Sequence, residues 1–118
     1  MSRKLDAAIA EALGYVVDYA STYEKGKIVE NKLMPGIKRG IYSYGCPYYS
    51  TDGNAMIELD REMQEQGYCF RHIFINGAND FKVTYYTKND DSFIGRASTM
   101  PLALALAAYK ALMGMSEG

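Results

Sequence analysis

The spacing of apolar residues predicts a helix at the start of the chain. Leu5, Ile9 and Leu13 recur at every fourth position, so they share one face of a helix over residues 2–13. Gly14 follows the last of them and is expected to end the helix, because glycine readily takes the left-handed conformation that helix C-termini favour. The chain therefore opens with an amphipathic helix.

The stretch that follows, residues 15–44, shows no such period. It mixes short β-prone pieces, at 15–17 and 27–29, with glycines that are expected to break them. These glycines are Gly26, Gly36 and Gly40. The pattern leaves the path of residues 24–45 open.

A second helix is predicted behind residues that can cap its N-terminus. Ser50 or Thr51 can accept hydrogen bonds from the free amides of its first turn, and Asp52 complements the helix dipole. The expected buried stripe consists of Met56, Leu59 and Met63. The charged side chains beside it are expected on a solvated face: Glu58, Asp60, Arg61, Glu62 and Glu65. Gly67 is expected to end the helix.

Aromatic and β-branched residues then predict strands. The segments 68–75 and 81–87 are rich in both, and the turn residues 76–80 separate them, which is typical of a hairpin. A second turn at 88–91 leads into 92–97. A three-stranded antiparallel meander is therefore expected, with one face of the middle strand formed by Phe81, Val83 and Tyr85.

The last predicted helix is apolar on most of its sides. Thr99 can cap it, and Pro101 falls in its first turn, where a missing N–H costs little. One ridge consists of Leu102, Leu106, Tyr109 and Met113. A strip of small residues, which allows another helix or sheet to approach closely, consists of Ala103, Ala107 and Ala111. Together the elements predict one α+β domain over residues 1–118, in which about three helices accompany a small antiparallel sheet.

Composition and charge narrow the function classes. Thirteen basic and fourteen acidic residues give a net charge of −1, so the basic excess that duplex nucleic acid requires is missing, although a local basic patch stays open. Cys46 and Cys69 lack C-x-x-C spacing, and with one histidine they cannot complete a zinc site, so buried free thiols and no metal or cofactor are expected. The longest apolar run, 100–109, is about half of what a bilayer requires. A cytoplasmic protein without a membrane partner is expected.

No catalytic constellation is found in the sequence. The single histidine, His72, lies inside a predicted strand, and no hydrolase, metalloprotease or phosphate-loop spacing occurs. Glu58 and Glu62 would share a helix face, but exposed acidic neighbours are usually a solvated surface. Catalytic residues are therefore not expected, and the chain is interpreted as a non-enzyme.

Two groups of residues could instead bind an anionic aromatic ligand. Tyrosines that can stack on a base follow Arg39 directly, and the entry of the last helix offers hydroxyls, free amides and an arginine to a phosphate. Ordinary packing of the tyrosines and ordinary helix capping are the alternatives. The candidate ligand-binding residues are Arg39, Tyr42, Tyr48, Tyr49, Arg96, Ser98 and Thr99.

Two of the predicted helix starts also resemble a known family. The stretch 47–52, Pro-Tyr-Tyr-Ser-Thr-Asp, and the stretch 97–108, which contains Thr-Met-Pro-Leu-Ala, are similar to motifs of the phage ABA sandwich proteins. The resemblance implies a phage origin and a layered α/β/α sandwich with helices flanking the sheet, but no catalytic residues. Where family members often carry Trp, this chain has Tyr15 and Tyr68, and residues 24–45 cannot be mapped onto the family.

The resemblance and the candidate residues lead to two functional hypotheses. By analogy with small phage proteins that act as sponges, the first is a non-enzymatic protein of the infected host's cytoplasm that sequesters a nucleotide-type immune signal, a cyclic oligonucleotide or cyclic ADP-ribose. This anti-CBASS or anti-Thoeris activity would use a pocket at the interface of a homo-oligomer. The alternative is an interaction module without a small-molecule ligand, which binds a host or phage protein through an exposed strand edge or an apolar helix face.

Overall fold

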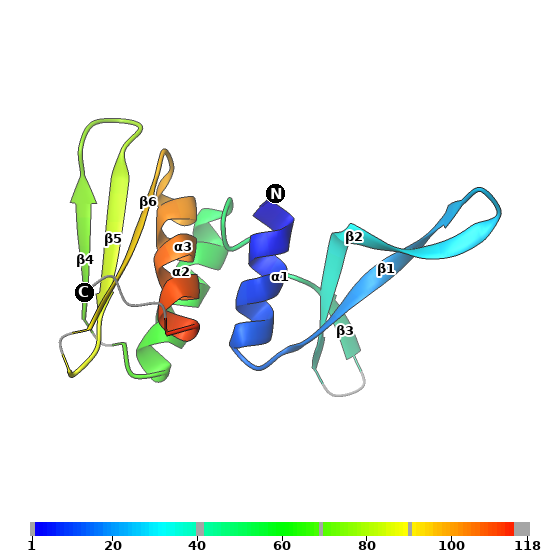
Figure 1. The fold of residues 1–118 in the computed structure, drawn as a ribbon, viewed down its shortest axis with the longest axis horizontal. Coiled ribbons are helices and arrows are strands. Elements are labelled where there is room, and N and C mark those ends of the chain that lie inside the picture. Colours follow the sequence, from blue (N-terminus) through cyan, green and yellow to red (C-terminus); the bar gives the residue numbers. More distant parts are fainter. Residues whose placement is uncertain (1, 40–41, 69, 90, 115–118) are drawn as a thin grey trace.

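The computed structural model describes residues 2–39, 42–68, 70–89 and 91–114. Within them the chain forms three helices and six strands, and the strands make two antiparallel sheets of three strands each (Figure 1). The order of elements is α1 (Ser2–Ala12), β1 (Val16–Glu24), β2 (Lys27–Arg39), β3 (Tyr42–Gly45), α2 (Gly53–Glu65), β4 (Phe70–Ile75), β5 (Phe81–Tyr86), β6 (Ser92–Ala97) and α3 (Met100–Leu112). The expected α+β class and the expected meander β4–β5–β6 are confirmed.

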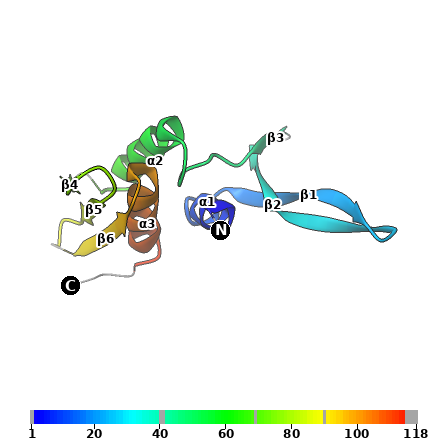
Figure 2. The same cartoon turned by 90° about the horizontal axis from the view of Figure 1, so that it is seen from above.

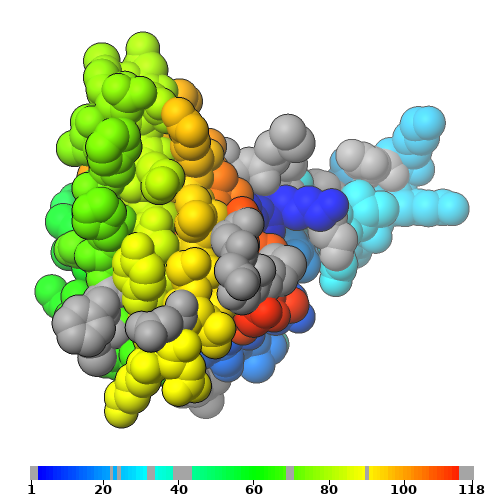
Figure 3. Space-filling model, turned by 60° about the vertical axis from the view of Figure 1, so that its left-hand side comes forward, coloured from blue at the N-terminus to red at the C-terminus, as the bar shows by residue number. Residues whose placement is uncertain are grey.

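The two sheets lie at opposite ends of the molecule, with the helices between them (Figures 1 and 2). Helix α3 packs on β5 and β6, α2 packs beside it, and α1 contacts α3 on one side and the β1–β2–β3 sheet on the other. The expected sandwich placed a sheet between helices, whereas the structure places the helices between two sheets. The reason is that β2 and β3, which fall in the stretch 24–45 whose path the sequence left open, pair with β1 into a second sheet against α1. The outward face of the β4–β5–β6 sheet forms the front surface in Figure 3.

The molecule is longer than a domain of its size usually is. It measures 51 × 32 × 24 Å, and its radius of gyration is 15.5 Å, against about 13.5 Å for a compact domain of this length. The excess comes from β1 and β2, which extend as a ribbon well beyond the helices (Figure 1).

Helix α3 approaches its sheet closely because small residues meet at the contact. A Cβ atom added to Gly95 on β6 would lie 2.1 Å from the carbonyl oxygen of Ala103 and 2.4 Å from the amide nitrogen of Ala107. The expectation that the alanine strip allows such an approach is confirmed. The ridge of larger residues is not the buried face: Leu102, Leu106 and Tyr109 are half-buried, and Met113 is exposed.

The start of α2 differs from the expected cap. Asp52 is the N-cap residue, and its carboxylate accepts a hydrogen bond from the Asn54 backbone N–H at 3.1 Å. Thr51 is exposed, while Ser50, the residue directly before it, is buried. Thr99 does occupy the N-cap position of α3, but its hydroxyl makes no capping hydrogen bond.

The second sheet is built from a long hairpin and a short third strand. Lys25 and Gly26 form its two-residue turn, and both have positive φ angles, 51° and 78°, as a type I′ turn requires. The expected break at Gly26 is therefore confirmed, whereas Gly36 lies inside β2, and Gly40 lies outside the described residues. Ile37 is buried and anchors this sheet to the core beside α1.

Candidate functional site

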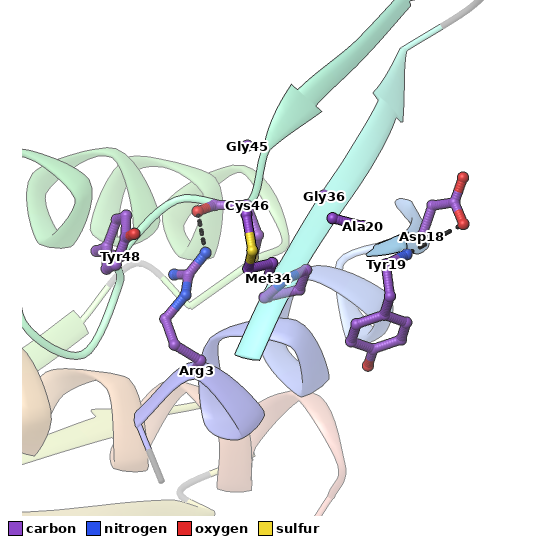
Figure 4. A pocket seen from close by; sticks show the side chains of 10 residues that line it. Arg3, Asp18, Tyr19, Ala20, Met34, Gly36, Gly45, Cys46 and Tyr48 are labelled. Atoms are coloured by element: carbon purple, nitrogen blue, oxygen red, sulfur yellow. Dashed lines mark hydrogen bonds between the residues drawn. The ribbon is translucent and has the colours of Figure 1, made fainter. Parts of the chain in front are cut away.

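A buried ion pair fastens α1 to the segment that leads into α2. The Asp6 carboxylate is fully buried and accepts hydrogen bonds from Arg3 Nη1 and from the Ser50 backbone N–H, both at 2.9 Å. The Arg3 guanidinium also donates to the backbone carbonyl of Cys46, at 2.9 Å (Figure 4), and to that of Pro47, at 3.3 Å. The positive charge of Arg3 is therefore neutralised within the chain and serves to hold this segment in place.

An open groove of about 410 Å³ lies beside this ion pair, where α1 meets the second sheet (Figure 4). The central carbon of the Arg3 guanidinium lies 3.7 Å from the centroid of the Tyr48 ring, so one face of that ring is covered. Gly36 and Gly45 pair across β2 and β3 and leave part of the groove wall without side chains. The groove offers a flat apolar surface and an aromatic ring that is 54% exposed.

Cys46 lines the groove but is poorly suited to be a nucleophile. Burial raises the pKa of its thiol to about 11, and the nearby charge of Arg3 offsets only part of this effect. Because the thiolate is the reactive form, Cys46 is inert at neutral pH. The expected buried free thiol is confirmed for Cys46, whereas Cys69 lies outside the described residues.

The structure divides the sequence-predicted ligand residues between the two ends of the molecule (Figure 1). Arg39 and Tyr42 pair at the ends of β2 and β3, and their side chains lie outside the described set. Arg96 lies on β6, and Ser98 and Thr99 connect β6 to α3, at the end of the molecule that carries the β4–β5–β6 sheet. Within one chain, these two groups do not form a common pocket.

The two neighbouring tyrosines of the predicted site have different environments. Tyr49 is 2% exposed and belongs to the hydrophobic core, while Tyr48 lies at the groove and stacks on Arg3. Arg96 is exposed, and its guanidinium forms two hydrogen bonds with the Asp80 carboxylate, at 2.8 and 2.6 Å. This contact raises the pKa of Arg96 and lowers the pKa of Asp80. Tyr48 is thus the candidate residue that lines the groove.

The prediction that Asp60 lies on a solvated face of α2 is wrong, because its carboxylate is the second one that is buried. Asp60 is buried and accepts hydrogen bonds from Arg71 Nε at 2.8 Å and from the Tyr85 hydroxyl at 2.7 Å. Burial, together with the hydrogen bond to Asp60, raises the pKa of Tyr85, so the phenol stays a donor. The cluster ties α2 to β4 and β5 and is satisfied internally, which makes it structural.

The spacing of Asp60 in the sequence indicates burial, although its charge favours a solvated surface. Asp60 follows Met56 by four positions and precedes Met63 by three, so it falls on the buried stripe of the helix. Arg3 and Asp6 likewise show the spacing of a helical ion pair. No spacing of this kind links Asp60 to Arg71 or Tyr85, because the fold brings these residues together.

The remaining acidic side chains of α2 surround a shallow hollow near Tyr49. Glu58, Glu62 and Glu65 line it, and Glu62 accepts a hydrogen bond of 2.5 Å from the hydroxyl of Tyr15. Among the described residues, no group of three or more His, Cys, Asp or Glu side chains is arranged to hold a metal ion.

The outer part of the β1–β2 hairpin exposes a pair of large apolar side chains. We call residues 21–30 the arm tip. Within it Tyr23 lies directly opposite Ile28, and the two are 75% and 67% exposed. The register shifts between Tyr19 and Ser21, where β2 carries additional residues, so the arm tip is set off from the part of the sheet that packs on α1. An aromatic and a β-branched side chain therefore form an exposed cross-strand pair at the far end of the molecule (Figure 1).

Comparison of the chain with protein-family models, with curated proteins and with solved structures finds no match. The phage-family resemblance therefore stays an expectation from the sequence. In the parts of the chain that the structure describes, every helix is too short or too polar to cross a bilayer.

Proposed function

We propose that the protein is a non-enzymatic binding protein that engages a protein partner through the arm tip. One observation carries the proposal: the exposed Tyr23–Ile28 pair at the end of a projecting two-stranded ribbon. A two-stranded hairpin gains little stability from its own contacts, and large apolar side chains at its end cost solubility without adding to the core. An interaction with a partner accounts for both features.

The expected mode of binding is insertion of the pair into an apolar pocket of the partner. Aromatic side chains that fill a pocket contribute most of the free energy in many protein interfaces, and they cluster with a few neighbours. Tyr23 and Ile28 form such a cluster, and the tight Lys25–Gly26 turn lets both side chains enter a narrow opening. The partner is therefore a protein with a concave apolar surface, as expected for a host or phage protein in the cytoplasm of an infected cell.

Variants of the arm tip test this proposal. Tyr23→Ala combined with Ile28→Ala should leave the folded core unchanged and remove a protein that co-purifies stoichiometrically with the wild-type chain from its native cells. The control is Val16→Ala, because Val16 is similarly exposed but lies at the base of the ribbon. A partner that is lost equally from both variants, or from neither, would argue against the arm tip.

The second candidate is the nucleotide-type sequestration expected from the sequence, and the groove beside Tyr48 is the observation that favours it. The exposed ring of Tyr48 offers a surface for stacking, but the charge of Arg3 is already neutralised by Asp6. A ligand with several phosphates would need further cations from a second copy of the chain. Calorimetry with cyclic di- and trinucleotides and cyclic ADP-ribose isomers should then show binding that Tyr48→Ala weakens, and the absence of heat with every compound would contradict it.

A further inference from the structure

The outward face of the β4–β5–β6 sheet combines aromatic rings with basic side chains. The strand register places Phe74 beside Lys82 and Arg96 in one row, and His72 beside Thr84 and Ile94 in the next. Tyr86 extends the same face at the end of β5. The opposite face of the sheet is covered by α3, and the outward face forms the front surface in Figure 3.

The rings on this face are accessible. Phe74 is 52% exposed and Tyr86 is 37% exposed. His72, which is also exposed, lies in the row of residues between them. Counted along the sheet, Phe74 and Tyr86 are four residues and one strand apart, which corresponds to about 14 Å. A single base cannot contact both rings, and neither can two adjacent bases, whereas two bases separated by intervening nucleotides of one extended strand can.

The charges on the face favour an anionic partner. Among the described strand positions of this face, Lys82 and Arg96 are basic and none carries a carboxylate. Arg96 is held across the edge of the sheet by Asp80 in an exposed ion pair. Because this pair is exposed to solvent, a phosphate can compete with the carboxylate for the guanidinium, which binds either group through two hydrogen bonds.

We propose that this sheet face binds single-stranded nucleic acid, with bases stacked on Phe74 and Tyr86 and phosphates at Lys82 and Arg96. Base stacking on aromatic side chains tolerates any sequence, and basic residues beside the rings hold the backbone. A protein partner fits less well, because lysine is depleted at the centre of protein interfaces. The net charge of −1 disfavours duplex binding but not a local contact with one strand.

The test is fluorescence anisotropy with labelled twelve-nucleotide oligo(U) and oligo(dT), at low and at moderate salt concentration. Binding of one or both is expected at low salt, and the difference between them reports whether the 2′-hydroxyl is contacted. Phe74→Leu keeps an apolar side chain but removes the flat ring, so it should weaken binding about fivefold or more without unfolding the sheet. Tyr86→Ala should act similarly, and Tyr86→Phe should retain binding.

Two further variants separate stacking from charge. Lys82→Ala should reduce the salt dependence of the association constant, by about 0.7 in the slope of its logarithm against the logarithm of the salt concentration. Tyr44→Ala, which removes a ring that is exposed to the same 52% as Phe74 but lies on the other sheet, should leave the affinity unchanged. The proposal is overturned if neither oligonucleotide binds at low salt. It is equally overturned if Phe74→Leu and Tyr86→Ala bind as the wild-type chain does, or if a duplex of the same length competes equally well.

Discussion

The buried carboxylates of Asp6 and Asp60 hold helices in place. Asp6 joins α1 to the segment before α2, and Asp60 joins α2 to the β4–β5–β6 sheet. Each accepts hydrogen bonds from an arginine and from a neutral donor, which compensates the cost of removing the charge from water. Ser50 lies 44 residues from Asp6, and Tyr85 lies 25 residues from Asp60, so both carboxylates act as crosslinks of the tertiary fold.

Removing the Asp6 carboxylate should destabilise the protein strongly. Asp6→Ala leaves the Arg3 guanidinium without its counter-charge and the Ser50 amide without its acceptor, and breaking a buried pair in this way costs about 3–5 kcal/mol. The matched control is Asp18→Ala, because the ion pair of Asp18 with Lys38 is exposed and should contribute less than about 1 kcal/mol. Urea unfolding compares the two variants, and similar losses in both would contradict the structural role of Asp6.

The hydroxyl of Tyr85 should stabilise the fold in a pH-dependent manner. Because the pKa of Tyr85 is raised above its ordinary value of 10, the folded phenol keeps its proton where the unfolded one ionises. This contribution is complete below about pH 10 and is lost as the pH rises further. Tyr85→Phe should lower the free energy of unfolding at pH 7 by about 1.5–3 kcal/mol, since a hydrogen bond to a charged group is removed.

The same variant should also change the alkaline limb of the stability profile. Urea unfolding of the wild-type chain between pH 9 and 11 should show a steeper decline than that of Tyr85→Phe. Parallel declines would mean that the Tyr85 hydroxyl does not contribute to the pH dependence.

The elements differ in how much the sequence revealed about them. The β4–β5–β6 meander was predictable because its strands are rich in aromatic and β-branched residues, are separated by turn residues, and place apolar side chains at every second position of β5, at Phe81, Val83 and Tyr85. Strands β1 and β2 were not, because most of their length is exposed on both faces and carries no such period. Gly36 looked like a break for the same reason, although its place in β2 is set by pairing with Asp18 and Gly45.

The close contact between β6 and α3 should make Gly95 intolerant of any side chain. In Gly95→Ala the new Cβ would overlap backbone atoms of Ala103 and Ala107, so the helix or the strand must move. Overpacking of this kind costs about 1–3 kcal/mol, and contact with backbone places this variant at the upper end. Gly45→Ala is the control, because a Cβ there meets no atom within 4 Å. Thermal unfolding should show a clear loss for Gly95→Ala, and equal melting temperatures for the two variants would contradict the packing described.

At the scale of the whole molecule, a packed body is combined with a projecting ribbon. The body contains the three helices and the meander, and both of its buried carboxylates lie there. The ribbon adds length without adding to the core, and its end carries the Tyr23–Ile28 pair. The sequence does not indicate this division. Arg39 and Arg96, which were predicted to bind one ligand, belong to sheets at opposite ends of the molecule (Figure 1).

The proposal that the arm tip binds a protein partner is tested most directly by site-specific photocrosslinking in the native cells. A photoreactive phenylalanine analogue at position 23 should give one dominant adduct, while the same analogue at position 89, in the exposed turn after β5, should not give that adduct. Loss of the adduct when Ile28→Ala is introduced beside it would show that the cross-strand pair binds as a unit. No adduct at position 23, or the same adducts at both positions, would contradict the proposed function.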